Sequence, residues 1–247
     1  MITTLAGGRV LAEKHGSIPP RVVALHGWGR DGTDFETVLS GLDAVSIHLP
    51  GFGPAPAPDT AWSTEQYAEL VAEAIAPHAP VTIVGHSFGG RVAVRLAARH
   101  PELVRGMVIT GAPLVRLTAA APPPLSFRVA KWANARGILS DQRMEALRRQ
   151  RGSADYRAAQ GVMRDVLVTA VSENYDDDLA AISCPVRMVW GENDTAAPTD
   201  AGRVASERIP GARFRVVDGA AHLMTGDLEL AVREELLTLL DEQDRPA

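Results

Sequence analysis

One ten-residue stretch, Val81–Gly90, constrains the fold of this chain more than any other part of it. Its first four residues, Val-Thr-Ile-Val, are apolar or β-branched and predict a buried strand. The residues that follow, 91–99, are mostly good helix formers with apolar side chains at helical spacing. Between them lies Gly85-His-Ser-Phe-Gly89, a G-x-S-x-G motif in the strand–turn–helix context of a nucleophile elbow.

The serine and the two glycines of this motif each have a physical role in such an elbow. The serine, Ser87, takes a strained backbone conformation so that its hydroxyl projects above the sheet. A β-carbon at Gly85 or Gly89 would collide, because strand and helix approach closely. The helix that begins under the serine can stabilise negative charge there. The alternative is a glycine-rich turn with an ordinary serine, so the rest of the chain must decide.

Composition narrows the class of protein. A chain of 247 residues suits one large α/β domain, or a core with a small insertion. The net charge of −5 gives no reason to expect nucleic acid as a partner. The single cysteine, Cys184, leaves no intramolecular disulfide, and no histidine pair has metal-binding spacing. Without a signal-peptide pattern or a run of about 18 apolar residues, we expect a cytoplasmic protein with no membrane partner.

Strands and helices alternate along most of the chain. Strands are predicted at residues 8–14, 20–25, 44–49, 81–84, 104–110, 185–190 and 213–217. Helices are predicted at residues 34–42, 63–78, 91–99 and 226–242. Ser63 and Gln66 form the expected capping box of the second of these helices. The alternation predicts a mostly parallel sheet with helices on both faces and a binding site at the carboxyl ends of the strands.

The alternation stops between residues 113 and 180. The stretches near 125–136, 140–151 and 154–175 have helical patterns with no strand between them. A helical insertion of this kind is expected to form a cap over the site. The predicted domains are therefore a core of residues 1–112 and 181–247 and a cap of residues 113–180.

The predicted cap is basic although the whole chain is acidic. Residues 113–172 contain ten arginines or lysines, against five acids when Glu173 at the edge is counted. One interpretation of this charge is a solvated helix surface. The other is a surface that steers an anionic substrate or an acidic carrier protein towards the site.

Three polar residues, Ser87, Asp194 and His222, each follow a predicted strand. A serine hydroxyl attacks well only when a neighbouring base takes its proton, and histidine is the base best matched to neutral pH. A carboxylate then holds the histidine in the right tautomer. We therefore expect these three residues to form a catalytic triad. The open alternatives are Glu192, Asp200 or Asp218 as the acid and His26 or His86 as the base.

A glycine-bearing loop, His26-Gly-Trp-Gly29, follows the strand at 20–25. Such a loop lets backbone N–H groups face a ligand. Beside a nucleophilic serine, the N–H of Phe88 is the natural first donor of an oxyanion hole and that of Trp28 the second. The alternative is a tight turn in which Trp28 merely packs.

Five segments together resemble the α/β-hydrolase superfamily over essentially the full chain. They are His26-Gly-Trp-Gly29, Leu49-Pro-Gly-Phe-Gly53, Gly85-His-Ser-Phe-Gly-Gly90, Gly191-Glu-Asn-Asp194 and Gly219-Ala-Ala-His222. The resemblance implies an eight-stranded sheet, a helical cap between strands six and seven, and no cofactor. It also implies an oxyanion donor at Trp28. Where the usual motif has aspartate before Leu-Pro-Gly, this chain has His48, outside the triad.

Within the superfamily, the serine at the elbow argues against haloalkane dehalogenases and epoxide hydrolases, which use aspartate there. The chain looks most similar to short carboxylesterases, including those that demethylate pimeloyl-carrier-protein esters. We therefore expect a serine hydrolase that cleaves a small carboxylic ester through an acyl-enzyme, with an acidic acyl-carrier protein as a candidate partner at the basic cap. The open alternatives are carbon–carbon bond hydrolysis, thioester hydrolysis, acyl transfer, and ligand binding on a hydrolase scaffold.

Overall fold

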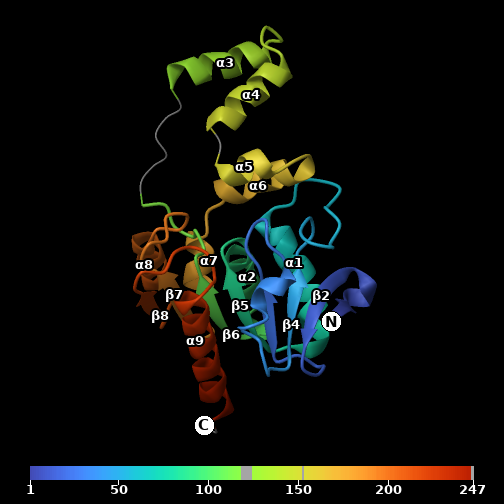
Figure 1. Ribbon diagram of the computed structural model, residues 1–247, viewed down its shortest axis with the longest axis vertical. Coiled ribbons are helices and arrows are strands. Elements are labelled where there is room, and N and C mark those ends of the chain that lie inside the picture. The colour runs from blue at the N-terminus through green and yellow to red at the C-terminus, as the bar shows by residue number, and fades with distance from the viewer. Residues whose placement is uncertain (118–123, 152, 246–247) are drawn as a thin grey trace.

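An eight-stranded sheet runs through the molecule in the order β1-β2-β4-β3-β5-β6-β7-β8 (Figure 1). The computed structural model describes residues 1–117, 124–151 and 153–245. The strands are β1 (Ile2–Leu5), β2 (Val10–His15), β3 (Val22–Leu25), β4 (Ala44–His48), β5 (Val81–His86), β6 (Val104–Thr110), β7 (Val186–Gly191) and β8 (Arg213–Val217). β2 is antiparallel to both of its neighbours, β1 and β4. Every other pair of adjacent strands in the sheet is parallel. The predicted mostly parallel sheet is confirmed.

The first strand, β1, is absent from the strands that the sequence predicts. Only Leu5 of its four residues is buried, so the segment carries no apolar pattern that could reveal a strand. It pairs with β2 at the edge of the sheet, and the strand predicted at 8–14 is β2.

Successive side chains of the central strands enter two separate cores. In β3, Val23 and Leu25 join the core on one face, while Val22 and Ala24 join the core on the other. This alternation explains why the strand is apolar at every position. The helices α1 (Thr64–Ile75), α2 (Phe88–Arg99) and α8 (Thr199–Glu207) cover the first face, and α9 (Asp227–Asp244) covers the second.

Two helix predictions have opposite outcomes. The capping box of Ser63 and Gln66 is present at the start of α1. The helix predicted at 34–42 is wrong, because the chain forms a short 3₁₀ turn, Gly32–Phe35, followed by further turns. The Asp31 carboxylate accepts from the Thr33 N–H and Gly41 has a positive φ of 76°, which are turn features that propensity does not report.

Five helices lie between β6 and β7 in the described part of the chain. They are α3 (Leu125–Ala135), α4 (Asp141–Arg151), α5 (Ala154–Ala158), α6 (Val162–Ser172) and α7 (Asp176–Ala181). The single helix predicted at 154–175 is wrong, because Ala159 is extended and Gly161 has a φ of 52°. α7 packs on α2 and buries Leu179.

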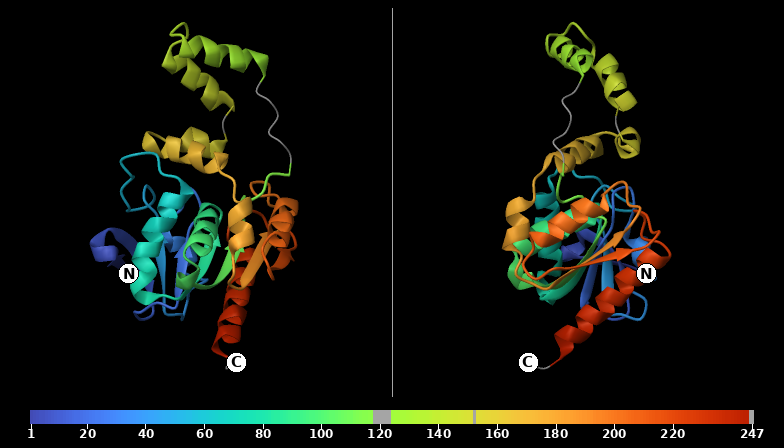
Figure 2. Two further views of the ribbon diagram at one scale, coloured as in Figure 1. Left: turned by 180° about the vertical axis from the view of Figure 1, so that it is seen from behind. Right: turned by 90° about the vertical axis from the view of Figure 1, so that its left-hand side faces the viewer.

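The insertion stands over one end of the sheet. Figures 1 and 2 show α3 and α4 farthest from the sheet, with α5 and α6 between them and the core. The division into a core of 1–112 and 181–247 and a cap of 113–180 stays a prediction. No helix among the described residues is both long and apolar enough to cross a lipid bilayer.

The Gly89→Ala substitution should destabilise the fold strongly. An alanine β-carbon at Gly89 would lie 2.0 Å from the Leu25 carbonyl oxygen, in backbone that cannot move aside. We expect a loss of at least about 3 kcal/mol in the free energy of unfolding, measured by urea denaturation. Gly211→Ala is the control, because that glycine faces open space and only its φ of 71° is strained. Equal unfolding midpoints for the two variants would contradict the steric explanation.

Candidate active site

Ser87 occupies a strained turn between β5 and α2. Its φ of 51° and ψ of −111° place it outside the regions that a side chain favours, and Ala6 is the only other non-glycine residue with positive φ in the described ranges. The Ser87 N–H donates to the Thr110 carbonyl at 2.9 Å. The Gly89 N–H donates to the His26 carbonyl at 3.0 Å. These two bonds anchor the turn on the end of β6 and on the residue that follows β3, and they maintain the strain.

The glycines of the motif lie where a β-carbon would collide with the neighbouring backbone, as the sequence predicted. A β-carbon at Gly85 would lie 2.8 Å from Gly90 Cα, and one at Gly90 would lie 2.6 Å from Ala112 Cβ. Together with the collision at Gly89, these distances confirm that strand and helix approach too closely for larger residues.

The structure brings Ser87, His222 and Asp194 together. His222 Nε2 lies 3.1 Å from Ser87 Oγ, and His222 Nδ1 lies 2.8 Å from Asp194 Oδ2. Asp194 is 5 % exposed, and its other oxygen accepts the backbone N–H groups of Ala196 and Ala197 at 2.9 and 2.7 Å. The Asp194 carboxylate therefore accepts a hydrogen bond from His222 Nδ1–H, which leaves the Nε2 lone pair to accept from the serine hydroxyl.

The alternative acid Glu192 has a different role. Its carboxylate accepts the Gly219 N–H at 2.9 Å, and the Asn193 N–H donates to the Ala220 carbonyl at 2.8 Å. Both bonds connect the loop that carries Asp194 to the loop that carries His222. They fix the relative position of these two loops.

His26 is buried behind the glycine-bearing loop. Its Nδ1 bonds the Gly27 carbonyl at 2.9 Å and its Nε2 accepts the Leu49 N–H at 3.0 Å. This pattern requires the neutral Nδ1–H tautomer. Burial lowers the pKa of His26 to about 4, so the ring is neutral at physiological pH. His26 therefore connects the loop after β3 to the loop after β4.

His86 has a similar structural position beside His222. Its Nε2 donates to the His222 carbonyl at 3.0 Å, whereas its buried Nδ1 has no partner in the described part of the chain. Burial, together with the neighbouring His222 ring, lowers the pKa of His86 to about 4. His86 fixes the backbone of His222, and no hydrogen bond joins its ring to Asp194 in the part of the chain that the structure describes. His26 and His86 thus hold loops, while His222 faces the serine.

The loop that contains Trp28 lies directly against the elbow. A β-carbon at Gly27 would be 3.3 Å from Ser87 Cβ. The Trp28 ring packs edge-on against Phe52 and Phe88, with centroids 4.9 and 5.4 Å apart. Neither the Trp28 nor the Phe88 backbone N–H has an acceptor among the residues that the structure describes. The Trp28 ring is therefore packed, and the two N–H groups remain free to donate.

His48, where the family motif has aspartate, is 2 % exposed. Its Nδ1 accepts the Gly32 N–H at 3.1 Å, and Ser46 Oγ donates to the Gly32 carbonyl at 2.6 Å. Both groups hold the turn that follows the glycine-bearing loop. The sequence predicts no partner for His48, because a contact across 16 residues has no local signal.

A pocket of about 400 Å³ opens at Ser87 and His222. Its remaining walls are Gly27, Trp28, Arg30, His86, Phe88, Arg91, Pro113, Ser153, Asp155, Leu167, Ala170, Val171, Ala196 and Leu223. The wall residues from α5 and α6 were not predicted from the sequence. Arg91 lies four residues after Ser87 on α2 and could have been found from that spacing.

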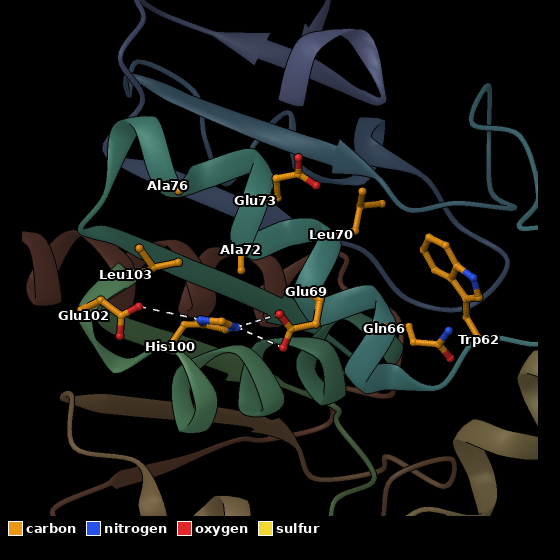
Figure 3. A pocket seen from close by; sticks show the side chains of 10 residues that line it. All are labelled: Trp62, Gln66, Glu69, Leu70, Ala72, Glu73, Ala76, His100, Glu102 and Leu103. Carbon is orange, nitrogen blue, oxygen red and sulfur yellow. Dashed lines mark hydrogen bonds and ion pairs between the residues drawn. The ribbon is translucent and has the colours of Figure 1, made fainter.

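A second and larger hollow, of about 670 Å³, lies outside α1 and shares no residue with the triad pocket. Figure 3 shows His100 there between Glu69 and Glu102. His100 Nε2 lies 3.1 Å from both Glu69 carboxylate oxygens. None of the described residues that line this hollow is a serine, cysteine or threonine, so the larger volume does not by itself identify the reactive site. No cluster of three or more His, Cys, Asp or Glu suited to a metal ion occurs in the described ranges.

A model of the alpha/beta hydrolase family matches residues 22–234. The chain belongs to this family. One relative, a pimeloyl-[acyl-carrier protein] methyl ester esterase of Neisseria meningitidis serogroup C, is 30 % identical over 224 residues, which cover 82 % of this chain and 86 % of that protein. Esterase Rv0045c of Mycobacterium tuberculosis is 35 % identical over 113 residues, which cover 44 % and 38 % of the two chains.

Solved structures of alpha/beta hydrolases share the fold. The bromoperoxidase of Bacillus anthracis superposes with a TM-score of 0.73 at 19 % identity, covering 98 % of this chain and 100 % of that chain. An esterase of Exiguobacterium antarcticum superposes with a TM-score of 0.70 at 21 % identity, covering 98 % and 99 %. The predicted α/β-hydrolase fold is confirmed.

Stability should fall as the pH falls from about 6.5 towards 4. Over this range unfolded histidines bind protons, while native His26 and His86 stay neutral because burial lowers the pKa of each to about 4. Each of these two histidines should therefore lower the free energy of unfolding by about 2 kcal/mol when the pH reaches 5. Urea denaturation at pH 7.5 and 5 tests this, and His86→Phe should lose less stability than the wild type over the same interval. Identical losses would refute the assignment for His86.

Proposed function

We propose that this chain is a serine hydrolase that cleaves carboxylic esters through an acyl-enzyme. The observation that carries the proposal is the hydrogen-bonded series Ser87, His222 and Asp194 at a strained elbow. The printed names of the relatives from Neisseria and Mycobacterium, both esterases, support the same reaction class. Water is the only co-reactant that the reaction needs.

In the first half-reaction, Ser87 Oγ attacks the ester carbonyl as His222 Nε2 takes its proton. Asp194 stabilises the imidazolium that forms, through the bond from Nδ1. The tetrahedral oxyanion accepts the N–H groups of Trp28 and Phe88, and each donor contributes about 3 kcal/mol of transition-state stabilisation. His222 then protonates the leaving alcohol, which departs and leaves the acyl group on Ser87.

In the second half-reaction, water replaces the alcohol. His222 removes a proton from the water as its oxygen attacks the acyl carbonyl, and the same two N–H groups hold the second oxyanion. Collapse of this intermediate returns the proton to Ser87 and releases the acid. The buried bonds of His26 and His86 keep both loops in position throughout the cycle.

Replacing Ser87 with alanine should lower kcat on the order of 10⁶-fold, because the nucleophile is lost while the pocket remains. Steady-state hydrolysis of a panel of small methyl esters measures this. In parallel, a fluorophosphonate should label the wild type stoichiometrically at Ser87, located by peptide mass spectrometry. The Ser206→Ala variant is the matched control, since that serine lies at the end of α8 and its hydroxyl donates to a carbonyl of its own helix.

A loss of less than tenfold in Ser87→Ala would contradict the proposal. A folded wild-type protein that resists the fluorophosphonate and also a smaller sulfonyl fluoride would favour ligand binding without turnover. Turnover of thioesters or ring-cleavage products in preference to esters would assign the same triad to a different bond.

A carrier-bound ester is the second candidate for the substrate. Residues 125–151, which form the α3–α4 hairpin, contain seven arginines or lysines and two acids. Arg128, Lys131 and Arg143 are exposed and form no ion pair with a residue that the structure describes. Such a surface complements an acidic carrier protein, and the Neisseria relative is named for a carrier-bound ester. A solvated helix surface is the alternative.

Charge reversal of Arg128, Lys131 and Arg143 to glutamate should lower kcat/KM for an acyl-carrier-protein ester about tenfold relative to kcat/KM for the free methyl ester. The cause is the loss of electrostatic attraction, so the wild-type preference should also weaken with salt. Arg213→Glu, on β8 away from the hairpin, is the control. If the ratio of the two kcat/KM values does not change in the triple variant, the carrier-protein interpretation is contradicted. The basic hairpin is then a solvated surface.

A further inference from the structure

The α3–α4 hairpin carries an exposed apolar face. Leu125, Val129 and Trp132 recur at positions i, i+4 and i+7 of α3, so they lie on one side of the helix. These side chains, and that of Ile138 just beyond the helix, are between 53 and 72 % exposed. Figures 1 and 2 show the hairpin as the part of the molecule farthest from the sheet. Several large apolar side chains gathered on one exposed surface indicate an interaction site.

Basic side chains border this apolar face. Arg128 is exposed one turn after Leu125, and the Arg136 guanidinium lies over the Trp132 ring, 4.1 Å from its centroid. The hairpin has seven arginines or lysines and two acids, although the whole chain has a net charge of −5. An apolar centre with tryptophan and arginine is typical of protein interfaces. A complementary surface is therefore apolar at its centre and acidic at its border.

The hollow outside α1, called the α1 hollow below, has an apolar floor. Trp62, Leu70 and Leu103 line it, and each is half-buried because one side of it packs against the core. The Trp62 ring also packs edge-on against Tyr67, with centroids 5.3 Å apart. The core therefore holds this floor in place before anything binds to it. A volume of about 670 Å³ can accept large side chains.

Acidic side chains border the α1 hollow. Glu69, Glu73 and Glu102 line it, and at least half of each side chain is exposed. Figure 3 shows Glu69 beside His100, which also lies near Glu102, and Arg9 pairs with Glu73 from outside the hollow. The described residues that line the hollow include no arginine or lysine. Exposed ion pairs are weak, so the carboxylates can accept other cationic partners.

We propose that the α3–α4 hairpin of one copy of this chain docks in the α1 hollow of a second copy. The apolar face of α3 covers the floor of the hollow, and the cations of the hairpin meet its three glutamates. Within one chain the two surfaces are both exposed, so neither covers the other. Each copy offers one hairpin and one hollow. The contact is therefore head-to-tail, and it joins copies into rings or chains.

This self-association goes beyond the proposed esterase function and does not depend on it. Sedimentation velocity of the wild type from about 1 to 100 µM should show the average mass at least doubling, because an interface of this size gives a Kd on the order of 10 µM. Raising the salt concentration to about 0.5 M should weaken the association, since charges at the border of the interface are screened.

Removing the aromatic side chain at the centre of the apolar face should weaken the association. Trp132→Ala should raise the Kd at least tenfold, because tryptophans at the centre of an interface carry much of the binding energy. Leu230→Ala is the matched control, since Leu230 is 57 % exposed on α9, outside both surfaces. Its Kd should equal that of the wild type.

A charge exchange assigns the two surfaces to each other. The hairpin variant carries Arg128→Glu with Lys131→Glu, and the hollow variant carries Glu73→Lys with Glu102→Lys. Each variant alone should be monomeric, because its hairpin and its hollow then have charges of the same sign. An equimolar mixture should associate again, because each hairpin then meets a hollow of opposite charge. This recovery also shows that both variants are folded.

Two results would overturn the proposal. One is a wild type that stays monomeric up to about 100 µM, which leaves the hairpin to a carrier protein or to solvent. The other is self-association that persists in the hairpin variant or does not return in the mixture, which places the contact elsewhere. Neither result bears on the esterase proposal, because Ser87 labelling and ester turnover are measured separately.

Discussion

The close approach of α2 to β3 is the contact on which the rest of the site depends. Gly89 lies against the carbonyl groups of Leu25 and His26 with no room for a β-carbon, and its N–H donates to the second of them. This contact holds Ser87 in its strained conformation. It also places the loop that follows His26 beside the serine, so one packing constraint positions the nucleophile and the candidate oxyanion donors together.

Buried neutral histidines extend this arrangement to the neighbouring loops. His26 connects the loop after β3 to the loop after β4, and His86 connects the end of β5 to the backbone of His222. Each forms its bonds where water is excluded, so the ring must give up its charge. The three loops around Ser87 are therefore held by hydrogen bonds that require both histidine rings to be neutral, and protonation at acidic pH would break them.

The helix that begins at the elbow also connects the core to the insertion. Arg91 reaches the Ala170 carbonyl on α6, and Arg95 reaches Asp178 on α7. The pocket consequently has one wall from the sheet side and one from the insertion. Specificity can change through the helices of the insertion while the triad geometry, set by the sheet, stays the same.

The sequence by itself determined the parallel sheet, the elbow and the order of Ser87, Asp194 and His222, because each depends on local pattern. Parallel strands all end at the same edge of the sheet. Residues that directly follow these strands are therefore expected to lie together there, even before the tertiary structure is known. The pocket walls, the bond from Arg91 to Ala170, the partner of His48 and the edge strand β1 emerged only from the tertiary structure. These features join residues far apart in sequence through shape and burial, which leave no periodic signal in the chain.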